Sequence, residues 1–185
     1  MVKLSDIKVN IVPTILKGLN YAKAQTDKFH EVFGHKVSKT PTALSREEVI
    51  TRARFIMEEL VELTATVAEN STDHFNINNK LIQALTDAET KQTKVGYGST
   101  NLIVAQADAL TDINYFVQGT FTMMGVEPQP LFDIVQEANM AKLGADGKPI
   151  YRESDGKIMK PEGWEAPEPK LEAEIENQKL QKAGN

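Results

Sequence analysis

The chain has 185 residues, of which 41% are hydrophobic, and a formal net charge of -5 at pH 7. This length suits one ordinary domain, or one domain with a tail. The acidic balance disfavours a protein that wraps a nucleic-acid duplex, because neutralising phosphates requires a basic face. The chain contains no cysteine, which excludes thiolate metal sites, a cysteine nucleophile and disulfides. Any metal ion must therefore be bound by oxygen or imidazole.

No segment approaches the ~20 apolar residues that a membrane-spanning helix needs. The apolar patch near the N-terminus is too short and too interrupted for a signal peptide. We therefore expect a cytoplasmic protein with no membrane partner.

The spacing of apolar residues predicts a series of helices. Ser45 and Glu48 form a capping box that begins the second of them, and Gly34, Gly125 and Gly144 are placed to end the first, fourth and fifth. In chain order, the predicted helices cover residues 13–33, 46–70, 75–91, 101–124 and 128–143.

These elements predict an all-α fold, a helical bundle of about five helices over residues 1–144. Residues 145–185 are rich in turn-forming sequences such as ADGKP and ESDGK, and we expect them to form a short irregular tail that packs on the same domain. A small hairpin is expected around residues 150–158, and a charged helical or frayed end from Lys170.

The second predicted helix carries three acidic residues, Glu58, Glu59 and Glu62, within little more than one turn. At 100° per residue they cluster opposite its apolar face, a pattern that is common for a solvated helix surface. However, no Lys or Arg occurs between Arg54 and Lys80, so the repulsion has no basic residue nearby in the sequence.

The fourth predicted helix has only two charged residues, Asp108 and Asp112, which share one face. A helix this apolar is usually central in its domain, where a carboxylate is costly unless it is paired or bound to a cation. Two alternatives follow: the aspartates pair with a residue such as Arg52 or Arg54, or they join Glu59 and Glu62 around a hard cation. Oxygen ligands of this kind suit Mg²⁺, with Mn²⁺ as a possible substitute.

The ordered series of segments FHEVFG, RARFIMEELVEL, DALTDINYFVQGT, EANMAKL and SDGKIMKPEGW resembles the all-α nucleoside triphosphate pyrophosphohydrolases, a superfamily that includes MazG-like and phosphoribosyl-ATP pyrophosphohydrolase-like proteins. The similarity covers most of residues 29–167. It implies a Mg²⁺-dependent hydrolase of phosphoric anhydrides that cleaves a nucleoside triphosphate between the α and β phosphorus atoms, giving the monophosphate and pyrophosphate.

The resemblance also implies roles for the acidic residues. Glu59, Glu62 and Asp112 match metal-ligand positions, and Glu58 matches the first Glu of the motif, which we assign to a metal ion or to the attacking water as general base. Asp108 departs from the pattern, because the superfamily places its first acid three residues before the last, where Ala109 stands here. Both spacings point along one helical face, so we retain Asp108 as a metal ligand.

Substrate contacts are expected after the acidic motifs. Asn139 and Lys142 match an Asn and a Lys that contact substrate in the superfamily, although a Lys in a last helical turn also complements the helix dipole. Lys157 and Lys160 belong to a loop that could cover the polyphosphate or form a solvated turn. Tyr115 could touch the nucleotide or serve in packing. Tyr151 and Trp164 could cap a base or anchor the tail to the core, and we expect the second.

The resemblance further implies that the helices bearing the two acidic motifs are adjacent and antiparallel, and that the protein is a homodimer or a higher homo-oligomer. A house-cleaning role in the nucleotide pool is one expectation. Two alternatives remain: a non-catalytic helical module that binds a metal or a partner, and a hydrolase of another pyrophosphate compound such as phosphoribosyl-ATP. No phosphate-binding P-loop or nucleophile elbow occurs in the sequence.

Overall fold

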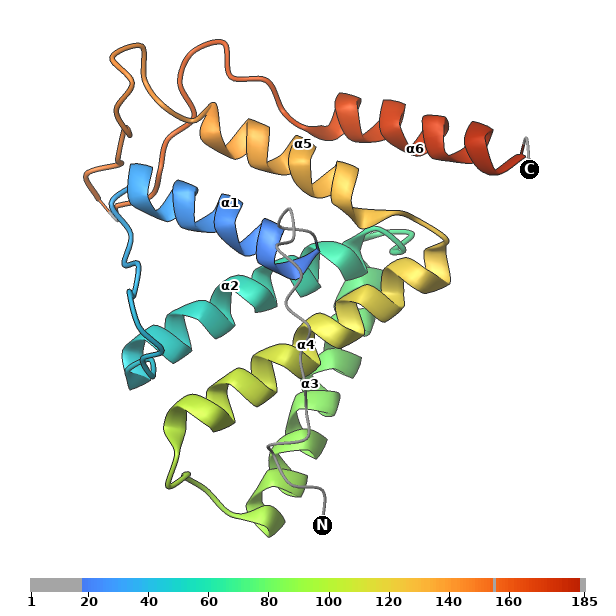
Figure 1. Cartoon of the computed structure of the whole chain (residues 1–185). Coiled ribbons are helices and arrows are strands. Elements are labelled where there is room, and N and C mark those ends of the chain that lie inside the picture. The colour runs from blue at the N-terminus through green and yellow to red at the C-terminus, as the bar shows by residue number, and fades with distance from the viewer. Residues whose placement is uncertain (1–17, 155, 184–185) are drawn as a thin grey trace, which may run out of the picture. The chain divides into compact units, whose positions relative to one another are not determined.

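The computed structural model describes residues 18–154 and 156–183, and within these residues the chain forms six α-helices and no β-strand (Figure 1). The all-α class predicted from the sequence is therefore confirmed. In chain order the helices are α1 Leu19–Val32, α2 Arg46–Ala65, α3 Ser71–Val95, α4 Leu102–Met124, α5 Pro128–Met140 and α6 Glu168–Ala183.

The ends of α1 and α2 follow local sequence signals. Gly34 ends α1 by adopting φ 64°, a left-handed conformation that glycine reaches without a steric penalty. At the start of α2, the Ser45 side chain accepts a hydrogen bond from the Glu48 amide, and the Glu48 carboxylate accepts one from the Ser45 amide. The capping box is therefore confirmed, whereas the predicted start of the first helix, at residues 13–17, lies outside the described residues.

Two predicted boundaries in the middle of the chain are wrong. The second helix ends at Ala65 instead of near Asn70, and the third begins at Ser71 instead of Phe75. Asn70 explains both differences, because its side chain accepts a hydrogen bond from the Asp73 amide and caps α3. The third helix also continues to Val95, where Gly96 follows with φ 100°.

The C-terminal part of the chain is more ordered than the sequence indicated. The fifth helix ends at Met140, earlier than predicted, and the end of the tail forms the sixth helix, α6. The charged helical end expected from Lys170 is therefore confirmed as α6, and the described residues form six helices where about five were predicted before the tail. The small hairpin is present, with antiparallel bridges between Leu143 and Pro149 and between Tyr151 and Ile158.

The helices belong to two compact units. The first unit comprises the described residues up to Lys39 together with those from Tyr115 onward, and the second unit comprises Thr40–Asn114. The helix α4 crosses from the second unit into the first at Tyr115. The predicted division of the chain at residue 144 stays a prediction.

In the first unit, α1 packs against α5 and α5 packs against α6. Its core centres on Phe33, which is completely buried and stacks on Phe29 with ring centroids 4.3 Å apart. The Tyr151 hydroxyl donates to the Phe33 carbonyl, and the Gln136 amide donates to the Gln25 carbonyl at 2.9 Å. The tail is thus attached directly to the end of α1.

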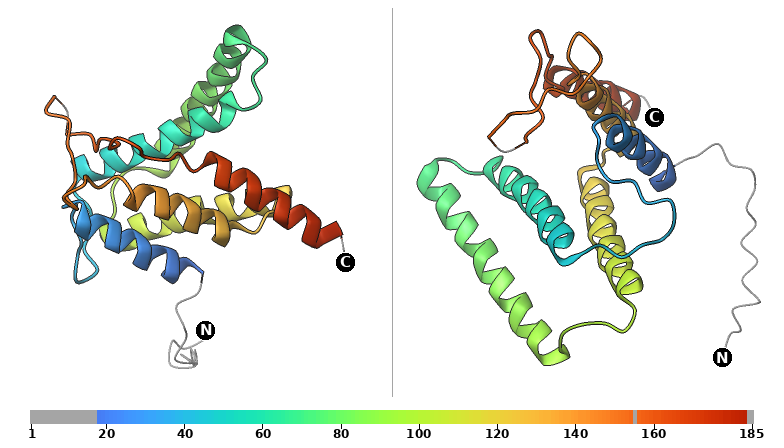
Figure 2. Two further views of the ribbon diagram at one scale, coloured as in Figure 1. Left: turned by 90° about the horizontal axis from the view of Figure 1, so that it is seen from above. Right: turned by 90° about the vertical axis from the view of Figure 1, so that its left-hand side faces the viewer.

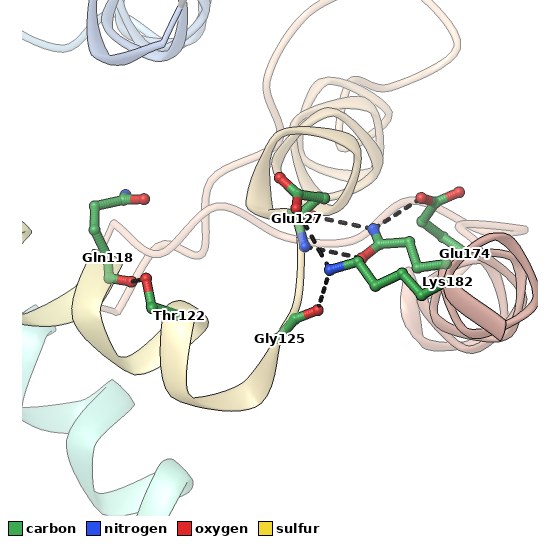
Figure 3. Close-up of polar contacts among 7 residues, drawn as sticks. Gln118, Thr122, Gly125, Glu127, Glu174 and Lys182 are labelled. Carbon is green, nitrogen blue, oxygen red and sulfur yellow. Dashed lines mark hydrogen bonds and ion pairs between the residues drawn. The ribbon is translucent and has the colours of Figure 1, made fainter. Parts of the chain in front are cut away.

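The helix α6 is held to the turn before α5 by side-chain bonds to the backbone (Figure 3). Gln178, which is 7% exposed, accepts from the Glu127 amide at 2.8 Å and donates to the Glu127 carbonyl at 3.1 Å. Lys182 donates to the Gly125 carbonyl at 2.6 Å. A largely polar helix is therefore fixed by hydrogen bonds more than by apolar burial.

In the second unit, α2 leads into α3, which runs back alongside it, and α4 then starts beside the beginning of α2 (Figures 1 and 2). The Gln106 side chain near the start of α4 accepts from the Leu44 amide at 2.8 Å and donates to the Leu44 carbonyl at 3.1 Å. Consequently α2 and α4 are adjacent but run in the same direction. The antiparallel expectation is wrong because the long α3 reverses the chain between them.

Candidate functional site

The three acidic residues of the first motif, Glu58, Glu59 and Glu62, are exposed on α2. Their position follows from the helix itself, because the capping box sets its start and the 3.6-residue period then places these acids away from its apolar side. Glu58 and Glu62 line one hollow on the surface of α2, together with the side chains of Arg54, Met57 and Val61.

A separate groove of about 320 Å³ lies between α2 and α4. Its lining is almost entirely apolar and includes Ile56 and Leu60 from α2 and Ala109 and Ile113 from α4. None of the predicted metal ligands lines this groove, since the acidic residues of both helices lie on other faces. Asp108 and Asp112 are exposed on α4.

The structure consequently does not bring the two acidic motifs of one chain together. Within the described ranges, 18–154 and 156–183, no group of three or more His, Cys, Asp or Glu side chains is arranged to hold a metal ion. The assignment of Glu59, Glu62, Asp108 and Asp112 as ligands stays a prediction, as does the role of Glu58.

The acidic side chains of the two motifs also lack basic partners. Among the described residues, none of the five forms an ion pair or a side-chain hydrogen bond, whereas other acids such as Asp27 and Glu137 pair with lysines. The alternative in which Arg52 neutralises an aspartate is not observed, because its guanidinium lies over the Phe55 ring, 5.5 Å from the centroid. Such unpaired carboxylates have the chemistry of a hard-cation site, with oxygen donors only.

The predicted substrate residues lie in the first unit. Asn139 is in the last turn of α5, and its side-chain oxygen accepts a hydrogen bond from the Lys142 ammonium at 2.8 Å. Partial burial lowers the pKa of Lys142, and the nearby charges of Lys160 and Lys157 lower it further. The structure thus brings Asn139 and three lysines together at one end of α5.

The tail reaches the same place through Trp164. Its indole N–H donates to the Ala138 carbonyl on α5 at 2.8 Å, which confirms the expected anchoring role. The Lys160 ammonium lies 4.0 Å from the ring centroid and the Lys142 ammonium 5.9 Å from it. These cation–π contacts are not predictable from the sequence, since the tail spacing alone does not place Lys160 and Lys142 on one ring.

Tyr115 lies at the boundary of the two units, with 76% of its surface exposed. Its ring makes an edge contact with the neighbouring Phe116, with centroids 6.4 Å apart. This position is not a packed core position, and the predicted contact of Tyr115 with a nucleotide stays a prediction.

No helix in the described part of the chain is both long and apolar enough to cross a membrane. A comparison of the sequence with curated proteins finds no match. A sequence model of the family described as phosphoribosyl-ATP pyrophosphohydrolase matches residues 26–139, which include both acidic motifs and Asn139.

Among solved structures, the chain is similar to the crystal structure of a protein from Exiguobacterium sp. 255-15 that is described as a candidate NTP pyrophosphohydrolase. The two chains share 43% sequence identity, with a TM-score of 0.81, and the match covers 87% of this chain and 97% of the other. This chain therefore belongs to the phosphoribosyl-ATP pyrophosphohydrolase family, within the all-α nucleoside triphosphate pyrophosphohydrolase superfamily.

Proposed function

We propose that this protein is a Mg²⁺-dependent nucleoside triphosphate pyrophosphohydrolase that cleaves between the α and β phosphates and releases a nucleoside monophosphate and pyrophosphate. The observation that carries the proposal is the set of five acidic side chains on α2 and α4 that have no basic partner among the described residues, in a chain of a pyrophosphohydrolase family. A triphosphate is itself anionic, so it approaches such a surface only when cations lie between the two.

The residues present fit a Mg²⁺ site by their chemistry, because all five donors are carboxylates. Glu59, Glu62 and Asp112, with Asp108 as the fourth, would hold the metal. When bound, Mg²⁺ would neutralise phosphate oxygens and polarise phosphorus toward attack by water. Glu58 would accept the proton of the attacking water as general base. We propose direct attack by water, because the sequence offers no nucleophile elbow for covalent catalysis.

The lysine group at the end of α5 supports the substrate part of the proposal. Lys142, Lys157 and Lys160 would bind phosphate oxygens as point charges. Asn139 would orient the Lys142 ammonium, to which its side-chain oxygen is bonded at 2.8 Å. Tyr115 would contact the nucleoside.

The test is incubation with a panel of ribo- and deoxyribonucleoside triphosphates and Mg²⁺, with pyrophosphate and monophosphate measured separately. We expect equimolar release of the two products, loss of activity in EDTA, and loss of at least about 100-fold in kcat/KM for Glu59→Gln, by analogy with the loss of a directly acting group. Glu47→Gln, an exposed change at the start of the same helix, is the matched control and should keep full activity.

Each alternative gives a different result in this experiment. Release of inorganic phosphate contradicts α–β cleavage. Turnover of phosphoribosyl-ATP with none of the nucleoside triphosphate panel supports the hydrolase of another pyrophosphate compound. Binding of Mg²⁺ without any turnover supports the non-catalytic metal-binding module.

The proposal includes a homodimer, because the second unit has no core of its own. Neither α2 nor α3 has a buried side chain, although both carry many large apolar residues. Those at least half exposed include Ile50, Leu63, Phe75, Ile82 and Leu85. A standard interface buries roughly 800 Å² of each partner, and the exposed apolar side chains of α2 and α3 would supply the apolar part of such an area. We propose that a second copy of this chain covers the exposed apolar side chains of α2 and α3.

A role in removing unwanted nucleotides from the cytoplasmic pool is consistent with this activity. It predicts that one base or sugar is preferred in the panel. The ratio of kcat/KM values between the best substrate and the common nucleotides measures that preference.

A further inference from the structure

The indole ring of Trp164 has two ammonium groups near it. Lys160 Nζ lies 4.0 Å from the ring centroid and Lys142 Nζ lies 5.9 Å from it. Both distances are within the range in which the negative face of an aromatic ring attracts a cation. Two lysines that are 18 positions apart in the sequence are thereby gathered around one side chain.

This arrangement collects positive charge around one ring, although Glu162 and Glu165 of the same tail line the groove beside Trp164. Among the described residues, neither Lys142 nor Lys160 forms an ion pair. The nearest acid along α5, Glu137, is paired with Lys170 at 3.0 Å. Repulsion from Lys160 and Lys157 also helps to lower the pKa of Lys142. Grouped cations that repel each other favour the binding of an anion with several charged oxygens.

Trp164 itself has a fixed position. Its N–H is bonded to the Ala138 carbonyl, and its ring forms part of the wall of a groove of about 440 Å³ between α5 and the tail. Asn139, which binds the Lys142 ammonium, is the next residue after Ala138. The ring, the amide and the first lysine are therefore held by one helix end, whereas free lysine side chains have several rotatable bonds.

We propose that Trp164 is a positioning residue that holds the ammonium groups of Lys142 and Lys160 as one binding site for an oligophosphate anion. The site would take the β and γ phosphates of a substrate or the released pyrophosphate, an identification that rests on the proposed function. Lysine suits this ligand because it binds phosphate as a point charge and needs no planar geometry.

The experiment measures pyrophosphate binding to the full chain in the absence of Mg²⁺ and without turnover. Trp164 is the only tryptophan in the sequence, so its fluorescence reports on this site directly. We expect a saturable change in emission on addition of pyrophosphate, and no such change with chloride at equal ionic strength. Lys142→Gln and Lys160→Gln should each weaken binding by about tenfold, and Lys148→Gln, an exposed lysine of the same tail, should not.

Two variants of the ring separate positioning from simple anchoring, with affinity measured by calorimetry. Trp164→Phe removes the N–H bond to Ala138 but keeps an aromatic face, whereas Trp164→Leu removes both. If Trp164 positions the lysines, the phenylalanine variant keeps most of the pyrophosphate affinity and the leucine variant loses about tenfold. Equal losses in both variants, or no loss in either, would overturn the proposal.

Failure of this inference is distinguishable from failure of the proposed function. A chain that binds pyrophosphate through Trp164 but hydrolyses no nucleotide refutes only the proposed function. A chain that hydrolyses nucleotides while its fluorescence and its Trp164 variants show no pyrophosphate site refutes only the role of Trp164.

Discussion

The two units of this protein use similar amphipathic helices but differ in how far their side chains are buried. The first unit buries Phe33 completely and Gln178 almost completely. In the second unit, neither α2 nor α3 has any buried residue. The first unit therefore has a small core around Phe33, although α1 and α5 themselves have no buried residue. The second unit lacks such a core and presents apolar surface, which in our proposal a second copy of the chain covers. Amphipathic helices indicate that a face will be covered, but they do not indicate whether the same chain covers it.

Both units join a helix to a loop through the same kind of hydrogen-bonded contact. In each, a glutamine side chain binds both the N–H and the C=O of one loop residue: Gln178 with Glu127 in the first unit, and Gln106 with Leu44 in the second. Such a pair satisfies two backbone groups with one side chain. Each unit thus has one glutamine that fixes a loop to a helix by hydrogen bonds, and the two units differ in the burial of apolar side chains.

The largest effect is expected in the core of the first unit. Phe33→Ala should lower the free energy of unfolding by about 3–5 kcal/mol, because it leaves a cavity at a completely buried site. Urea denaturation measures the change. Phe116→Ala, at a residue that is 73% exposed, is the control and should cost far less. Equal losses for the two variants would contradict the assignment of Phe33 as the centre of the core.

The next effect concerns the uncovered face of the second unit. Leu85→Glu on α3 should weaken self-association by roughly tenfold or more, since it places a charge in the proposed interface. Light scattering coupled to size-exclusion chromatography measures the mass over a dilution series. Leu180→Glu on α6, where the leucine is also largely exposed, should leave the mass unchanged. If the wild-type chain is monomeric at all concentrations, the proposed homodimer is refuted.

The two glutamines give a smaller and directly comparable effect. Gln178→Ala should cost about 1–3 kcal/mol, because the Gln178 side chain is almost completely buried and its loss removes the partner of the Glu127 N–H and C=O. Gln106→Ala should cost about 0.5–1.5 kcal/mol, because the Gln106 residue is only half-buried and water can replace its bonds to Leu44. Hydrogen exchange at Glu127 and Leu44 measures each loss locally, and a larger loss for Gln106 would reverse the ranking.

The smallest effect is a dependence of stability on pH. The pKa of Lys142 is lower in the folded chain than in the unfolded one, mainly through burial. Between the two pKa values the unfolded state binds more protons, so folding becomes more favourable as pH rises through this window. Lys142→Met should therefore be more stable than wild type at pH 7, and the difference should fade as pH approaches about 10.5. Lys148→Met is the control and should show no such pH dependence. If the stability difference between Lys142→Met and wild type does not change with pH, the lowered pKa of Lys142 is not its cause.

The sequence predicted the helices well where a local signal marks their ends. The Ser45–Glu48 capping box and Gly34 gave correct boundaries, because capping depends on residues within one turn. Asn70 was overlooked as a cap, and this single omission moved two boundaries. The sequence also placed Asn139 and Lys142 together correctly, although α5 ends at Met140 and the turn that follows the helix brings Lys142 to Asn139.

Long-range features were not predictable in the same way. The parallel direction of α2 and α4 depends on the length and path of α3 between them, which periodicity does not fix. Trp164 lies 22 positions after Lys142, and only the folded tail shows that its ring collects Lys142 and Lys160. The acidic motifs of one chain do not meet in the structure, and their shared role remains a prediction from the resemblance.

The acids of α2 and α4, which form no ion pair within residues 18–154 and 156–183, should make the stability of the second unit sensitive to its ionic surroundings. Mutual repulsion among carboxylates opposes the folded state, and any cation that binds there only after folding raises the melting temperature by mass action. Added salt relieves this repulsion only in a general way, through screening over about 10 Å at 0.1 M. A thermal shift produced by millimolar Mg²⁺, but not by the same ionic strength of Na⁺, is therefore a measure of cation binding that requires no substrate.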